Sequence, residues 1–273
     1  MDCSIVTFAG LNASTAPGAN TDEVSDESQQ VWVRDPLLFE RDRQVLQTLW
    51  LDDRVINAVQ QLLRRRYPHA HGLHDTVTLS ACADTVSADL PVIQCVHDVT
   101  NSHWLTISTV GCPADNVNVY CSMQQWPSER CFKAIMSYLK FTGNTVVARL
   151  ANVSKRDGGS DCGLYAIAYA EMLLRGLDPV NMVFNQEFLR THMISCLESG
   201  FVDPFPVICQ RTVRRQYVRQ NTVSLYCKCR TSYVRGDQMV ACNKCHSWFH
   251  CQCVGLTQED FAELRKDKAK KLL

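Results

Sequence analysis

The feature that most constrains the fold is an almost wholly apolar run, residues 164–174, which directly follows the segment GGSDCG. A helix that is apolar on all sides must be buried within a core, so we expect the chain to fold around this helix. Arg175, Gly176 and Pro179 supply the signals that end it. Cys162 then lies at the N-terminus of a central helix.

Two interpretations of Cys162 follow from its surroundings. A helix N-terminus favours the thiolate, and Gly158, Gly159 and Gly163 let the backbone bend and a substrate approach, as a nucleophile needs. A buried free cysteine is also a common small apolar filler. The local residues leave both interpretations open.

A second helix is predicted over LDDRVINAVQQLLRRRYP, residues 51–68. Asp52 or Asp53 can cap it, and Ile56, Val59 and Leu63 form one apolar face. The arginines at 64–66 suit its C-terminal dipole.

The stretch 91–121 is typical of strands, and NTVVARL (144–150) predicts another. HWLTISTV and NVNVYC flank the turn GCPADN and form a predicted antiparallel hairpin. A turn centred near Cys112 places His103 almost opposite Cys121, with both side chains on one face and within contact range.

Composition narrows the class of protein. The chain has 273 residues, 46% hydrophobic and 21% charged, with a formal net charge of zero, which indicates neither a nucleic-acid nor a membrane partner. MDCSIVTFAG lacks the pattern of a signal peptide, and no apolar run is long enough to span a bilayer. Without secretion, the fifteen cysteines indicate reduced thiols, metal ligands or catalysis in an intracellular protein.

Four segments are expected along the chain. Residues 1–30 are rich in small and polar side chains and are predicted to be disordered. Residues 31–208 form the main domain. Residues 209–224 carry four arginines and are predicted to be a basic linker, which is either simply solvated or touches nucleic acid. Residues 225–273 form a cysteine-rich module with a basic tail.

Three segments together resemble a known family: WLDDRVIN (50–57), HW (103–104) and GGSDCGLYAIAYA (158–170). They are similar to the signature segments of the ubiquitin-like-protein-specific cysteine proteases, the SUMO-protease (Ulp/SENP) type. The resemblance covers roughly residues 31–208. It implies an α+β fold with a papain-like core, and a cysteine peptidase that cleaves after the diglycine-like tail of a ubiquitin-like modifier or its conjugates.

The resemblance also implies roles for single residues. Cys162 is the nucleophile and His103 the general base. Trp50, Trp104 and Gly159 bind the substrate, the two indoles forming a narrow tunnel that only glycines pass. Simple core packing is the alternative for each tryptophan.

Two residues depart from the family pattern. Cys121 stands at the position of the orienting acid, and Arg156 replaces the glutamine that donates to the oxyanion. Asp115 and Asp161 are nearby in sequence, but the first lies in the turn and the second is expected to point elsewhere. A Cys–His pair keeps some activity without a third residue. The alternative function is therefore an impaired protease-fold scaffold that binds a ubiquitin-like protein and histone tails.

The C-terminal stretch YCKCRTSYVRGDQMVACNKCHSWFHCQCVGL predicts zinc binding through paired ligands: Cys227 and Cys229, Cys242 and Cys245, His250 and Cys253. It is similar to a PHD finger, whose cross-brace joins the first and third pairs at one ion. The second pair lacks its final partners, so the second site is half built unless His246 or Cys251 contributes. We expect about one Zn²⁺ per chain.

The PHD resemblance implies a histone-tail partner and a nuclear location. Trp248 matches the aromatic-cage tryptophan, with Tyr233 and Met239 as further walls around a methylated lysine. Packing of the small core is the alternative for Trp248. A protease beside a chromatin-reading module is also similar, by analogy, to proteins of mobile elements.

Overall fold

The computed structural model describes residues 29–77 and 85–270. The prediction of disorder for residues 1–30 therefore lies almost entirely outside the described residues. The elements, in chain order, are β1 (Val31–Arg34), β2 (Leu37–Phe39), α1 (Glu40–Thr48), α2 (Asp53–Arg66), β3 (His71–Gly72), β4 (Val86–Ser87), β5 (Val92–Asp98), β6 (His103–Ser108), β7 (Asn116–Tyr120), α4 (Glu129–Tyr138), β8 (Leu139–Lys140), β9 (Thr145–Ala151), α5 (Cys162–Leu174), η2 (Pro179–Asn181), β10 (Met182–Phe184), α6 (Gln186–Ser199), β11 (Val207–Gln210), β12 (Tyr217–Tyr226), β13 (Thr231–Ser232), β14 (Met239–Ala241), β15 (Trp248–His250), η3 (Gln252–Val254) and α7 (Gln258–Lys270).

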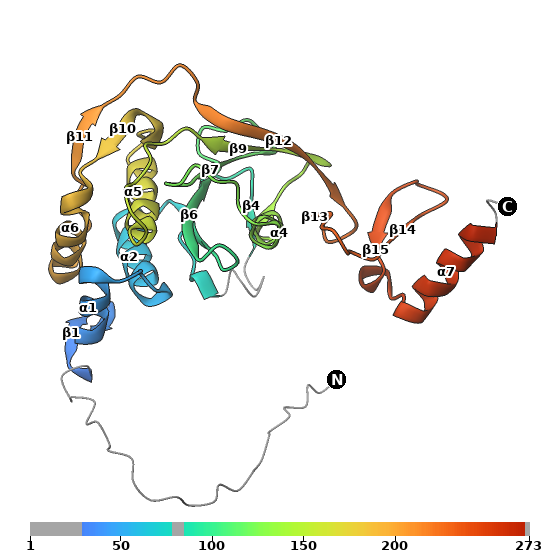
Figure 1. Cartoon of the computed structure of the whole chain (residues 1–273), viewed down its shortest axis with the longest axis horizontal. Helices are drawn as coiled ribbons and strands as arrows, with labels where there is room; N and C mark the ends of the chain where they lie inside the picture. Colours follow the sequence, from blue (N-terminus) through green and yellow to red (C-terminus); the bar gives the residue numbers. More distant parts are fainter. Residues whose placement is uncertain (1–28, 78–84, 271–273) are drawn as a thin grey trace, which may run out of the picture.

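A mixed seven-stranded sheet, ordered β13-β12-β9-β7-β6-β5-β3, forms the centre of the protein. One face packs against α5, with α2 and α6 completing the same core, and the opposite face packs against α4 (Figure 1). Successive residues of β6 point to opposite faces, so Trp104 joins the first core and Leu105 joins the second. This layering of helices on a mixed sheet confirms the α+β fold that the family resemblance implies.

Both predicted helices are present. In α5 every residue from Cys162 to Leu173 is buried, and Gly176, with φ +75°, follows its end. In α2, Asp52 is the N-cap and accepts a hydrogen bond from the Val55 N–H. The predicted apolar face of α2 is also buried: Ile56, Val59 and Leu63.

The hairpin of β6 and β7 forms, but its predicted register is wrong by two residues. Thr106 pairs with Tyr120 and Ser108 with Asn118, so Cys121 does not lie directly opposite His103. The turn is asymmetric, because Thr109 leaves the hairpin to bond β5 through its N–H and hydroxyl. A shift of two keeps each side chain on its expected face, so the two side chains still meet.

The predicted linker 209–224 is largely wrong as a structural assignment. Residues from Tyr217 to Ser224 belong to β12 and pair antiparallel with β9, from Ala151 to Thr145. The strand was missed because its side chains are mostly exposed and because the segment 209–224 that contains most of it carries four arginines. Its backbone hydrogen bonds, not side-chain burial, fix it in the sheet.

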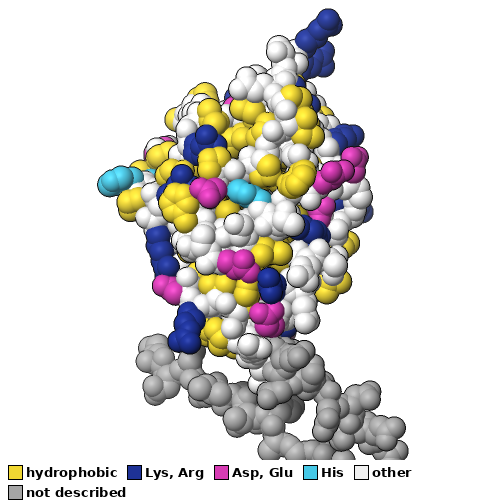
Figure 2. Space-filling view, turned by 90° about the vertical axis from the view of Figure 1, so that its left-hand side faces the viewer, with side chains coloured by type: hydrophobic (Ala, Val, Ile, Leu, Met, Phe, Trp, Pro, Cys, Tyr) yellow, Lys and Arg dark blue, Asp and Glu magenta, His cyan; other side chains and the backbone are white. Residues whose placement is uncertain are grey.

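No helix among residues 29–77 and 85–270 is long and apolar enough to cross a membrane. On the face formed by the left-hand side of Figure 1, basic and acidic side chains are interspersed (Figure 2). This mixture agrees with the zero net charge of the sequence.

Candidate active site and metal site

The three sequence segments that carry the family resemblance meet at Leu51. The Trp104 indole N–H donates to the Leu51 carbonyl at 2.8 Å. A Cβ built on Gly163 would lie 2.9 Å from the Leu51 Cβ, so only glycine allows α5 to begin this close. The Trp50–Leu51 segment, β6 and the start of α5 therefore converge at one place.

The loop before Cys162 is held by α6. Gln186 accepts from the Asp157 N–H at 2.9 Å and donates to the Asp161 carboxylate at 2.7 Å. Arg190 pairs with Asp161 at 2.6 Å and also donates to the carbonyls of Leu46 and Leu49. Asp161 thus points toward α6 and anchors the loop, which agrees with the expectation that it does not serve as the orienting acid.

His103 contacts Cys121. The His103 Nε2 lies 3.2 Å from the Cys121 Sγ, and both residues are buried. The residue at the predicted acid position therefore does meet the predicted base, through a thiol. Asp115 is elsewhere, where its carboxylate accepts from the Gly143 N–H at 2.7 Å.

The electrostatic surroundings keep this pair neutral. Burial, followed by the nearby Arg156 charge, lowers the pKa of His103 to about 4. Burial raises the pKa of the Cys121 thiol. At neutral pH we therefore expect an uncharged imidazole beside an uncharged thiol.

Arg156 is close enough to act on His103, but its side chain folds onto its own loop. One guanidinium nitrogen donates to the Gly158 carbonyl, and the backbone N–H bonds the Ser122 carbonyl at 3.1 Å. Gly158 adopts φ +68°, which favours glycine there. Arg156 therefore braces the loop between β9 and α5.

The predicted substrate-binding residues lie in different environments. Trp104 is buried and stacks on His97 with ring centroids 4.6 Å apart, whereas Trp50 is 54% exposed, which excludes core packing for Trp50. Gly159 is exposed, and a Cβ built there would meet no atom within 4 Å. Open space at Gly159 and an exposed indole at Trp50 suit a surface that receives a peptide.

Cys162 lies at the first residue of α5 and is 1% exposed. The Thr106 hydroxyl of β6 donates to the Ala166 carbonyl of α5 at 2.6 Å, so the two elements pack directly. Among the described residues, the side-chain hydrogen bond of His103 goes to Cys121 and not to Cys162. Such contacts in free enzymes often tighten only when the substrate binds.

Asp98 is a buried carboxylate that sequence reasoning missed. It pairs with His103 across β5 and β6, and its negative charge offsets part of the lowering of the His103 pKa by burial and Arg156. Its oxygens accept from the Ser128 N–H and hydroxyl, at 2.7 and 2.6 Å, and from the Asn101 amide at 2.9 Å. Asp98 therefore holds Ser128, the N-cap of α4, beside the candidate site, and only its place at a strand end could have indicated it.

The four predicted ligands of the first metal site come together. One atom from each residue lies within 4.8 Å of the others: Cys227, Cys229, His250 and Cys253. Burial raises the pKa of Cys227, but backbone N–H groups and the His250 side chain outweigh it and lower that pKa to about 6. Three thiols and an imidazole in this space form a donor set that fits Zn²⁺.

The other predicted residues of the C-terminal module are only partly gathered. Cys242 and Cys245 interact, but no third ligand joins them in the described part of the chain, and Cys251 is buried at 1% exposure. In the hairpin of β14 and β15, Met239 pairs with His250 and Ala241 with Trp248, so Met239 and Trp248 share a face. Tyr233 and Trp248 are exposed.

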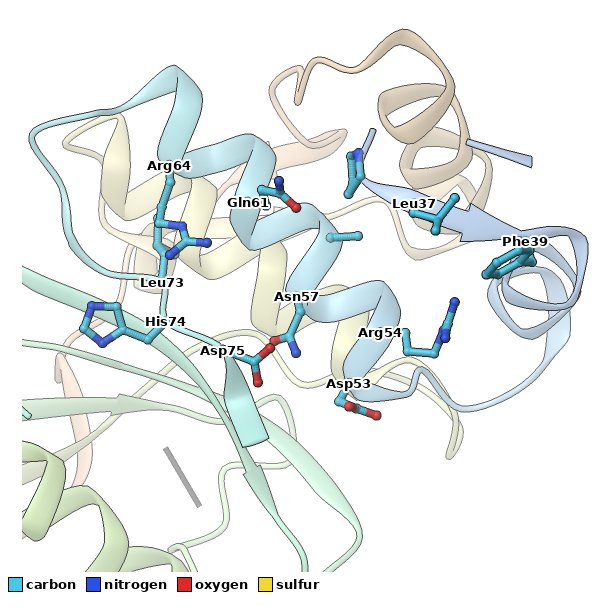
Figure 3. A pocket seen from close by; sticks show the side chains of 12 residues that line it. Leu37, Phe39, Asp53, Arg54, Asn57, Gln61, Arg64, Leu73, His74 and Asp75 are labelled. Atoms are coloured by element: carbon cyan, nitrogen blue, oxygen red, sulfur yellow. The ribbon is translucent and has the colours of Figure 1, made fainter. Parts of the chain in front are cut away.

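A cleft of about 410 Å³ lies along α2 (Figure 3). Its polar side chains have structural partners: Arg54 makes two hydrogen bonds to the buried Asp42, and Asn57 accepts from the Thr76 N–H. Neither Cys162 nor His103 lines it. This cleft is not part of the candidate active site.

Residues 84–203 match the model of the Ulp1 protease family, C-terminal catalytic domain. The chain carries a Ulp1-type protease domain. The match covers somewhat less than half of the chain, includes Cys121, Arg156 and both predicted catalytic residues, and ends before the C-terminal module.

The fold agrees with this assignment. A structure of the SUMO protease Ulp1, with its catalytic cysteine oxidised to a sulfinic acid, is 12% identical. The likeness covers 68% of this chain and 98% of that one, with a TM-score of 0.50. At this identity the likeness shows the Ulp1-type fold.

Short stretches also resemble chromatin proteins. Over 42 residues the chain is 45% identical to the chromatin remodeling protein EBS of Arabidopsis thaliana. Over 41 residues it is 42% identical to the nucleosome-remodeling factor subunit NURF301 of Drosophila melanogaster. These matches span 15% of this chain and only 18% and 2% of the respective relatives.

Proposed function

We propose that this chain is a cysteine peptidase that cleaves the peptide or isopeptide bond after the diglycine-like tail of a ubiquitin-like modifier. The observation that carries the proposal is the convergence of the Cys162 loop, the β6 segment of His103 and the exposed Trp50 at Leu51, within a Ulp1-type domain. Because the structurally similar Ulp1 is a SUMO protease, SUMO is the first modifier to test.

The proposed reaction is acyl transfer. The Cys162 sulfur attacks the scissile carbonyl carbon, and the backbone N–H of Cys162 stabilises the oxyanion, joined by Arg156 only if its guanidinium leaves the Gly158 carbonyl. His103 takes the thiol proton and gives it to the leaving amine as the C–N bond breaks. Water, deprotonated by His103, then hydrolyses the thioester and frees the modifier.

The C-terminal module is proposed to bind one Zn²⁺ and a histone tail, which makes the protein a nuclear enzyme. Cys227, Cys229, His250 and Cys253 would hold the ion, which stabilises the small module. The similarity to chromatin proteins supports the histone tail, and the shared face of Met239 and Trp248 supports a methyl-lysine site with Tyr233. The exposed Arg214, Arg215 and Arg219, in and just before β12, are a further, separate surface for nucleic acid.

A specific observation favours a second function, a scaffold that binds the modifier without cleaving it. The residue that orients His103 is a neutral thiol, and Arg156 is tied to its own loop. The deciding experiment is cleavage of a SUMO precursor that carries a C-terminal extension after its diglycine. Release of the extension by wild type but not by Cys162→Ala supports the peptidase. Binding of mature SUMO without any release supports the scaffold.

A further inference from the structure

The C-terminal module is continuous with the protease sheet. Ser224 of β12 pairs with Thr145 of β9, and the next residue, Leu225, donates its N–H to the Asn144 carbonyl at 2.9 Å. Leu225 is buried in the core beneath α4, and two residues later Cys227 is the first metal ligand. The position of this ligand is therefore set by the sheet of the protease domain.

Arg230, which directly follows the ligand Cys229, binds the segment between β8 and β9. Its guanidinium donates to the carbonyls of Phe141, Thr142 and Gly143 and to the Asn144 side chain. Thr231 and Ser232, which follow it, are 6% and 4% exposed. One guanidinium that satisfies four acceptors makes a specific, fixed contact between module and protease domain.

A second contact connects the metal site itself to α4. Lys133 of α4 lies 2.9 and 3.0 Å from the two oxygens of Asp237. Asp237 Oδ2 in turn lies 3.5 Å from His250 Nε2, which is buried and has no hydrogen bond within the described residues. The other ring nitrogen, Nδ1, lies 3.2 Å from the Cys229 sulfur, inside the ligand cluster.

This arrangement matches the chemistry of a metal-binding histidine. A histidine that ligates through one nitrogen usually directs the other to a carboxylate, which fixes the ring and raises its basicity. Here the carboxylate is held by a lysine that belongs to another domain. Because Lys133 and Asp237 are mostly shielded from solvent, at 34% and 18% exposure, salt weakens their attraction less than it weakens a surface pair.

We propose that Asp237 is the outer-shell carboxylate of the zinc site and that Lys133 holds it there, so that zinc binding fastens α4 to the module. The proposal rests on the zinc binding proposed above. Lys133 is thereby a positioning residue for a metal site in a different part of the chain. The contact reaches the candidate active site, since Ser128, the N-cap of α4, is bound to Asp98 beside His103.

The test uses the full chain and two measurements that do not depend on peptidase activity. Zinc affinity is measured by competition with a chromogenic chelator, and amide hydrogen exchange of α4 is followed with and without EDTA. Asp237→Asn should lower zinc affinity about tenfold or more. Lys133→Ala should lower it about two- to fivefold and speed exchange of α4 in the zinc-bound protein. In the Asp237→Asn background, Lys133→Ala should have no further effect.

Arg130→Ala is the matched control, because Arg130 is exposed on the same helix. If Lys133→Ala matches this control in both measurements, the proposed role of Lys133 in holding Asp237 is contradicted, even if the chain binds zinc. A wild-type chain that binds no zinc contradicts both the proposed metal site and the proposed role of Lys133 and Asp237 at that site. Because Lys133 lies outside the module, its variants remain informative if Asp237→Asn does not fold.

Discussion

Replacing Cys121 with aspartate puts a carboxylate where the structure holds a thiol 3.2 Å from His103 Nε2. A protonated thiol can donate its S–H to Nε2 of the neutral imidazole, which leaves the ring proton on Nδ1. The nitrogen left to serve Cys162 would then carry a proton and could not accept another. A carboxylate accepts from Nε2–H instead and frees Nδ1 as the base.

The charge also matters. Two opposite unit charges about 4 Å apart attract by about 4 kcal/mol at an effective dielectric constant of about 20. This attraction opposes the burial and the Arg156 charge that lower the pKa of His103 to about 4, so the pKa should rise toward its ordinary value. Desolvation of the new carboxylate offsets part of the gain.

We expect Cys121→Asp to raise peptidase turnover about ten- to a thousandfold. In a serine triad, losing the acid lowers turnover about 10⁴-fold. We expect a smaller effect here because a Cys–His pair depends less on its acid. Adding Arg156→Gln should give a further gain of up to about a hundredfold from a correctly aimed donor.

The assay is turnover of a diglycine-ended ubiquitin-like substrate, with Cys162→Ala as the blank. The matched control is Cys121→Asn, which has the shape of aspartate without its charge. NMR titration of the His103 ring in a Cys162→Ala background gives an independent readout. If Cys121→Asp is no faster than Cys121→Asn and leaves the His103 pKa unchanged, Cys121 does not stand at the acid position.

Three further predictions concern stability and metal content. Burial raises the pKa of Glu171 from 4.5 to about 7, so the folded state holds a proton that the unfolded state releases. The free energy of unfolding should therefore fall by about 3 kcal/mol as the pH rises from the unfolded-state pKa of 4.5 through the folded-state pKa of about 7. Urea unfolding at pH 5 and pH 8 measures this fall. An equal fall in Glu171→Gln would contradict the assignment to Glu171. Gly163→Ala should destabilise the fold by about 1–3 kcal/mol because the new Cβ would meet Leu51. Gly159→Ala is the control and should leave the melting temperature unchanged, since its Cβ meets no atom. Equal melting temperatures for the two variants would refute the close packing of α5 on Leu51. Cys229→Ser should abolish the single zinc expected per chain, and two zincs in wild type by elemental analysis would overturn the half-site argument.

The sequence predicts the elements whose own hydrophobic pattern shows which of their faces must be buried. The all-round apolar pattern of α5 requires burial, and the capped, one-sided pattern of α2 requires a single packed face. The hairpin residues alternate strongly enough to assign faces. They do not determine the register, since Thr109 leaves the hairpin to bond β5, and that contact is not local.

The features that the sequence does not predict depend on contacts between distant segments. β12 is mostly exposed and follows a run of arginines, so its segment has the composition of a linker, yet backbone bonds to β9 hold it in the sheet. Arg190 and Asp237 are charged residues of the kind common on any protein surface. Their roles depend on Asp161 and Lys133, which lie 29 and 104 residues away in the sequence. The candidate site was therefore predictable in its motifs, but not in the residues that hold those motifs in place.

The most direct measurement is covalent labelling of the full chain with SUMO that bears an electrophile at its C-terminal glycine, followed by mass spectrometry of the adduct. We expect one adduct per chain, located on Cys162, absent in Cys162→Ala and formed far more slowly in His103→Ala. Labelling that is absent from wild type, or that falls on another cysteine and is unaffected by His103→Ala, would contradict it.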